Sequence, residues 1–202
     1  MAATRQKQKE QTRSRLLRCA FELFSSHGIT TTKTVDVARE AGVSHGTVFV
    51  HFPTRDDLVA AVISEYTARI VRRIHELVES GATLQAVLAA HLEGLSEHEA
   101  FYTRLITEGP ILPPIARTTL IGIQSAISYH LAEAVEKEMT RGSIRNIPIH
   151  LLFNTWIGLV HHYLCNRDLF APGQSVLKRR GQELIVHYIG LLSPTDNKEE
   201  GS

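Results

Sequence analysis

Residues 36–52, DVAREAGVSHGTVFVHF, decide how this chain of 202 residues folds. Two short stretches with apolar residues at helical spacing flank Gly42, and Ser44 can cap the second stretch. Gly42 can supply the positive φ of a tight turn, while Val37 and Val48 can close a small core. Helices of six or seven residues are too short to be stable alone, so they must pack on each other and on a neighbouring helix. The pattern predicts a helix-turn-helix.

The flanking sequence predicts one helix before this motif and one after it. Residues 13–25, RSRLLRCAFELFS, carry an apolar stripe at helical spacing, and Gly28 can end that helix. Pro53 interrupts the chain after the motif. Thr54 and Asp57 then have the spacing of a helix start, and we expect the next helix to run from about 55 to 79.

The remaining sequence predicts a second, larger helical region and no strands. Helices are expected at 83–96, 97–107, 114–140, 148–166 and 175–192, separated by Gly- and Pro-containing breaks. The predicted fold is therefore all-α, with an N-terminal three-helix domain that contains the helix-turn-helix, followed by a larger helical domain. We place these domains at 1–54 and 55–193, with 55–79 as the connector and 194–202 as a disordered tail.

Composition and charge narrow the class of protein. Residues 1–55 hold nine Lys or Arg against four Asp or Glu, whereas the rest of the chain is net acidic, which suggests a module for a polyanion. No apolar run is long enough to span a bilayer, and two distant cysteines imply neither disulfides nor a thiolate zinc site. We expect a cytoplasmic protein that does not bind membranes.

The segment RLLRCAFELFSSHGI…DVAREAGVSHGTVFVHFPTRDDLVAAV resembles the N-terminal DNA-binding region of the TetR family of transcriptional regulators. The matching features are Phe24, Gly28, Val37-Ala38, Ala41-Gly42-Val43-Ser44, Gly46-Thr47, Phe49, His51-Phe52 and Arg55-Asp56-Asp57-Leu58. The resemblance implies a homodimeric regulator that binds a palindromic double-stranded DNA operator. It further implies a repressor released by a small-molecule effector, with no other cofactor.

The resemblance and the expected short recognition helix together suggest the residues that contact DNA. They are Lys33, Ser44, His45, Gly46, Thr47, Phe49, Val50, His51 and Arg55. His45 is the best candidate for a base contact, and Gly46 would let the DNA backbone approach closely. Thr47 and Arg55 are expected to bind phosphate. Phe49 stands where the family most often has tyrosine, so a phenolic hydrogen bond to phosphate is not possible there.

The second region is expected to bind the effector and a second copy of the chain. Candidate ligand residues are Phe101, Tyr102, Leu105, Glu108, Ile127, His130 and Phe153. The last two long helices resemble the family's four-helix dimer interface, for which the candidates are Trp156, Leu159, Tyr163, Leu184 and Tyr188.

Two other functions remain open on the sequence alone. A transcriptional activator of the same fold would carry the same motif. A metal-binding helical enzyme is the remote alternative, and the chain's eleven histidines are the reason for considering it. However, His161 and His162 diverge by about 100° on a helix and do not easily share one metal ion. The chain also lacks the familiar catalytic motifs, so we expect no enzyme and no metal site.

Overall fold

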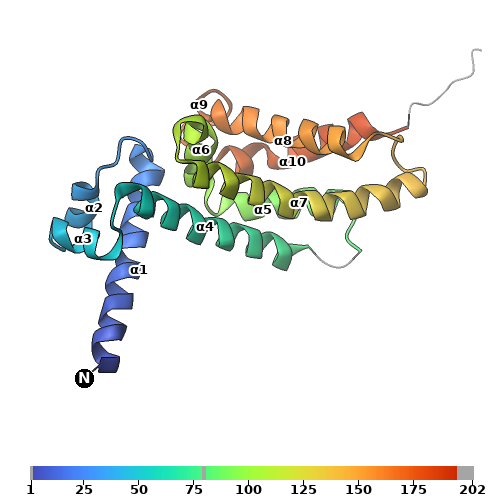
Figure 1. Ribbon diagram of the computed structural model, residues 1–202. Coiled ribbons are helices and arrows are strands. Elements are labelled where there is room, and N and C mark those ends of the chain that lie inside the picture. The colour runs from blue at the N-terminus through green and yellow to red at the C-terminus, as the bar shows by residue number, and fades with distance from the viewer. Residues whose placement is uncertain (1, 79–80, 195–202) are drawn as a thin grey trace, which may run out of the picture. The chain divides into compact units, whose positions relative to one another are not determined.

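The computed structural model describes residues 2–78 and 81–194, and within them every regular element is helical (Figure 1). The elements are α1 (Ala2–His27), α2 (Thr34–Glu40), α3 (His45–His51), α4 (Arg55–Leu77), α5 (Leu84–Ser96), α6 (Glu99–Glu108), η1 (Gly109–Ile111), α7 (Pro114–Thr140), α8 (Ile149–Cys165), α9 (Arg167–Phe170) and α10 (Val176–Leu192). The all-α prediction is confirmed. No helix in the described ranges is both long and apolar enough to cross a bilayer.

The largest difference from the expected helices is at the beginning of α1. The sequence predicted a helix from residue 13, because the apolar stripe begins there, but α1 starts at Ala2. The added residues are mostly Ala, Arg, Gln, Lys and Glu, which favour helix without burial. Gln6 also donates a hydrogen bond to Glu10 one turn later, at 2.8 Å. The short helices η1 and α9 were not predicted, and residues 195–202 of the expected tail lie outside the described residues.

The described chain divides into two compact units. The first contains residues 2–70 and 100–123, and the second contains residues 71–99 and 124–194 apart from the gap at 79–80. The division falls inside α4, α6 and α7, so each unit is built from pieces of distant sequence. The domain limits predicted from the sequence stay a prediction.

The first unit is held together by the apolar stripe of α1. Leu16, Ala20 and Phe24 are buried, as the helical spacing predicted. Phe21 stacks on Tyr66 of α4 with ring centroids 3.5 Å apart, and Phe101 of α6 lies 4.9 Å from Phe21. These ring contacts hold α1, against which α2 packs, to α4 and α6.

The second unit has a core formed by α5, α8 and α10. Trp156 and Tyr188 are almost completely buried, with ring centroids 5.1 Å apart. The indole N–H of Trp156 donates to Nδ1 of the buried His91 at 2.9 Å, and the Tyr188 hydroxyl donates to the backbone carbonyl of Leu152. Each large aromatic side chain with a polar group therefore has a hydrogen-bond partner inside the core.

Candidate nucleic-acid interface

The helix-turn-helix forms as predicted from residues 36–52. Val37 and Val48 are fully buried between α2 and α3, and Gly42 adopts a φ of 63° in the turn. Ser44 caps α3 by accepting a hydrogen bond from the Thr47 amide at 3.2 Å. The two short helices are thus held by a shared apolar contact and a defined turn, which gives α3 a fixed orientation.

The exposed face of α3 presents the side chains expected to read DNA. His45 and Gly46 are exposed, Phe49 is 40% exposed and Val50 is 71% exposed. His45 Nε2 lies 2.9 Å from the Thr34 hydroxyl of α2, and its ring makes an edge contact with Phe49. Phe49 and Val50 thus place two neighbouring apolar side chains on the exposed part of α3.

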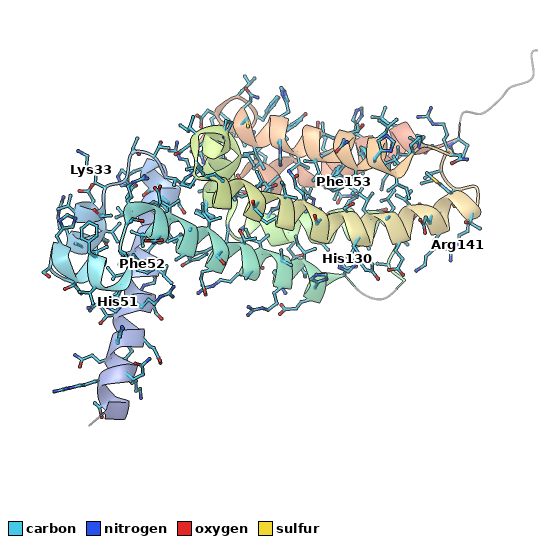
Figure 2. The ribbon with its side chains drawn as sticks, in the orientation of Figure 1. Lys33, His51, Phe52, His130, Arg141 and Phe153 are labelled. Atoms are coloured by element: carbon cyan, nitrogen blue, oxygen red, sulfur yellow. The ribbon has the colours of Figure 1, made fainter. Side chains whose placement is uncertain are left out.

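Thr47 and Lys33 occupy different settings. The Thr47 hydroxyl lies 2.8 Å from the Ser44 hydroxyl, so both side chains already take part in the cap of α3. Lys33 is exposed just before α2 and remains a candidate for phosphate (Figure 2). Thr32 donates to the Gly28 carbonyl at 2.7 Å. At the start of α2, the Asp36 carboxylate accepts from the Lys33 amide at 3.4 Å.

Arg55 has a different setting from the one expected for a phosphate contact. Its Nη2 donates to the carbonyl of Ile29 at 2.5 Å and to that of Thr30 at 3.4 Å, and its Nε donates to the carbonyl of Thr32 at 3.4 Å. The guanidinium therefore holds the loop between α1 and α2 against the start of α4. The predicted capping pair that begins α4 is confirmed, because Asp57 accepts from the Thr54 amide at 2.9 Å.

Glu108, predicted to anchor a ligand, binds the same loop from α6. Its carboxylate accepts from the amides of Ile29 at 3.3 Å and Thr30 at 2.7 Å, and its side chain is only 13% exposed. Arg104, one turn earlier, lies 3.9 Å from that carboxylate. No pattern in the sequence indicates this contact, because 78 residues separate Glu108 from Thr30.

Glu108→Ala should lower the free energy of unfolding by about 1–3 kcal/mol, because two backbone amides would lose a charged acceptor. Urea denaturation of both proteins measures the difference. Thr107→Ala is the control on the same helix, since its exposed hydroxyl bonds only within α6, and it should cost no more than about 0.5 kcal/mol. Equal stability of Glu108→Ala and the original protein would contradict a structural role for this carboxylate.

His51 lies at the carboxyl end of α3, beside the basic side of α1 (Figure 2). Its Nδ1 is buried and has no hydrogen-bond partner among the described residues. Burial lowers the pKa of His51, and the positive charges of Lys9 and Arg13 lower it further. The guanidinium of Arg13 also lies over the Phe52 ring, 5.1 Å from its centroid. Lys9 and Arg13 were not predicted as part of this surface.

The candidate ligand residues are divided between the two compact units. Phe101, Tyr102 and Leu105 are fully buried in the first unit. Glu108 belongs to the same unit, and its side chain is 13% exposed. Ile127 is fully buried in the second. His130 and Phe153 of that unit are partly exposed, and His130 Nε2 lies 2.6 Å from Nδ1 of His75 (Figure 2).

The candidate dimer residues separate into buried and accessible sets. Trp156, Leu184 and Tyr188 are at most 2% exposed within the single chain, so they pack the core of the second unit and offer no surface to another copy. Leu159 and Tyr163 are partly exposed on α8. Helical periodicity identified the apolar stripe of each helix but did not show which other helix would cover it.

Known proteins contain sequences similar to this helix-turn-helix. Residues 16–62 match the model of the bacterial regulatory proteins of the tetR family. The match covers the helix-turn-helix together with parts of α1 and α4. The chain is 36% identical over 67 residues to the HTH-type transcriptional repressor Rv3405c of Mycobacterium tuberculosis, a match that covers 33% of this chain and 36% of that protein. The chain thus spans about a third of the length of the first curated relatives that it matches.

Longer but weaker similarities extend beyond the helix-turn-helix. The chain is 26% identical over 144 residues to the transcriptional regulator UidR of Escherichia coli, covering 69% of this chain and 72% of that protein. A TetR-family regulator from Agrobacterium tumefaciens has a solved structure that aligns with a TM-score of 0.75 at 18% identity, over 92% of this chain and 100% of the other. The named relatives are regulators rather than enzymes, in agreement with the prediction.

Proposed function

We propose that this chain is a DNA-binding transcriptional repressor of the tetR family, which binds a palindromic operator as a homodimer and is released by a small-molecule effector. The observation that carries the proposal is the capped, rigidly packed α3, whose exposed face presents His45, Gly46, Phe49 and Val50. A helix of this kind fits the major groove, where base edges are distinguishable. The name of the Mycobacterium tuberculosis relative supports repression.

Selection of bound duplexes from a random DNA pool, repeated at two salt concentrations, tests the DNA-binding part. We expect one palindromic consensus with half-sites about 10 base pairs apart or a multiple of that spacing. Affinity should fall steeply with salt, because bound phosphates release counterions. If the purified protein enriches no sequence even at low salt, it is not a sequence-specific DNA-binding protein.

Gly46→Leu should weaken operator binding at least tenfold without destabilising the protein. A Cβ at Gly46 would meet only the Ser44 hydroxyl, at 3.9 Å, so the fold has room for a side chain. Leucine also favours helix over glycine by up to about 1 kcal/mol. Fluorescence anisotropy with the selected duplex measures binding, and thermal unfolding measures stability.

The matched control for Gly46→Leu is Gly122→Leu on α7, where an added Cβ meets nothing within 4 Å. It should leave operator affinity within twofold of the original. Unchanged affinity in Gly46→Leu would show that this part of α3 does not approach DNA.

Exposed apolar side chains on the last two long helices support dimerisation. Leu151 of α8 is 50% exposed, while Val186 and Leu191 of α10 are 59% and 49% exposed. Together with the partly exposed Leu159 and Tyr163, they give both helices an apolar surface that a second copy can cover. A dimer would bring two recognition helices to one palindrome, and a single short helix buries too little surface for tight binding.

Reporter expression from the selected operator distinguishes repression from activation. Removal of the regulator should raise expression if it represses and lower it if it activates. The effector would be found by screening small molecules for loss of operator binding.

The described residues contain no cluster of three or more His, Cys, Asp or Glu side chains placed to hold a metal ion. We place the protein in the cytoplasm with its operator.

A further inference from the structure

The recognition elements contain few cations that are free to bind phosphate. The sequence of α3, HGTVFVH, has no Lys or Arg. Arg39 of α2 is paired with Asp36 at 2.5 Å, and Arg55 donates to three backbone carbonyls. Lys33 is the exposed cation that remains nearby. Because neutralisation of phosphates supplies much of the affinity for DNA, an operator-binding chain needs further cations on the same side.

The unexpected N-terminal turns of α1 carry such cations. Arg5, Lys9 and Arg13 follow each other at intervals of four residues, so they form one stripe along the helix. All three are exposed, and none forms an ion pair within the part of the chain that the structure describes. At about 1.5 Å of rise per residue, the stripe is about 12 Å long with a cation about every 6 Å, so it can reach successive phosphates on one DNA strand.

The stripe begins beside the carboxyl end of the recognition helix. Arg13 lies over Phe52, and both Lys9 and Arg13 are close enough to His51 to act on its charge. From there α1 continues past α3 toward the N-terminus (Figure 1). A helix in the major groove has a phosphate strand on each side, so a cationic stripe leaving its end is placed to follow one of them.

We propose that the N-terminal turns of α1 form a second DNA-binding surface, in which Arg5, Lys9 and Arg13 bind the phosphates flanking each half-site. This proposal rests on the proposed function, since it extends the footprint of α3 on the operator. The contacts are to phosphate, so they strengthen binding without changing the preferred base sequence.

The double variant Arg5→Gln/Lys9→Gln tests this surface, because both positions are exposed and Arg13 keeps its contact with Phe52. We expect operator affinity to fall about 10- to 100-fold near physiological salt. The slope of log affinity against log salt should become shallower by about 1.8 for each protomer, since two phosphate contacts are lost. The selected consensus should stay the same. Anisotropy titrations over a series of salt concentrations give both quantities.

Lys7→Gln/Arg15→Gln is the matched control, because it removes the same charge from α1. These two residues lie more than about 100° around the helix from Lys9. Together with Arg13, they line a hollow of about 560 Å³ that Glu10 and Glu65 also line. We expect a change in affinity below threefold and an almost unchanged salt slope. Equal losses in the two double variants would indicate a diffuse effect of net charge and overturn the proposal.

Duplex length provides a second readout. Extending a minimal operator by five base pairs at each end should strengthen binding of the original protein but not of Arg5→Gln/Lys9→Gln. If the original protein selects an operator and this variant binds it with the original affinity and salt slope, the α1 surface is excluded while the proposed function stands. If the original protein selects no sequence, the proposed function itself fails.

Discussion

Replacing Glu99 with alanine should lower the free energy of unfolding of the second unit by about 3–5 kcal/mol. The Glu99 carboxylate is 8% exposed and accepts hydrogen bonds from the amides of Val176 at 2.9 Å and Leu177 at 3.1 Å. It also accepts from the hydroxyl of Ser175, the residue that caps α10. Each hydrogen bond to a charged group contributes about 1.5–3 kcal/mol. The negative carboxylate also interacts favourably with the positive end of the dipole of α10.

Urea denaturation followed by the fluorescence of Trp156 measures this loss, because Trp156 is the single tryptophan and lies in the same unit. Glu99→Gln keeps an acceptor but not the charge, so its loss should be intermediate. Glu97→Ala removes a neighbouring glutamate that is 43% exposed and pairs with Arg73, and should cost no more than about 1 kcal/mol. If Glu99→Ala costs less than about 1 kcal/mol, the start of α10 does not depend on the Glu99 carboxylate.

Glu99 also shows why the sequence predicted the helices better than their contacts. The helix predicted at 175–192 follows a Gly- and Pro-containing break, and in the structure Ser175 caps α10 by accepting a hydrogen bond from the Lys178 amide at 3.1 Å. The second acceptor at that point comes from 77 residues earlier in the chain, and no spacing rule connects the two positions. Local capping is therefore readable from sequence, whereas support across the fold is not.

The candidate DNA surface shows the same limit. The turn at Gly42 and the cap at Ser44 depend on residues within one short segment, and the sequence predicted both. Arg55 stays a candidate for phosphate because its position matches the family motif, but the sequence did not show that its guanidinium also donates to carbonyls of the loop between α1 and α2. The basic stripe of α1 was missed because a search for apolar periodicity cannot detect a helix that buries nothing.

Acid should destabilise the protein through His91, a completely buried histidine in the core of the second unit. Complete burial lowers the pKa of His91 from 6.5 to about 3, and nearby His161 acts in the same direction. Between these pH values the unfolded chain takes up a proton at this residue and the folded chain does not. The stability that His91 contributes is thus fully present above pH 6.5 and is lost as the pH falls toward 3, at about 1.4 kcal/mol per pH unit.

His91→Asn should remove most of this dependence, because the asparagine oxygen can accept from the Trp156 indole in place of Nδ1 but does not titrate. Urea denaturation between pH 4.5 and 8, followed by circular dichroism as well as tryptophan fluorescence, gives the slope for each protein. His150→Asn is the control, since His150 is exposed on α8, and it should keep the original slope. Parallel curves for His91→Asn and the original protein would show that the acid sensitivity comes from other groups. A shallower curve for His91→Asn alone would show that the buried hydrogen bond to Trp156 requires a neutral imidazole, and that protonation of His91 opens this core.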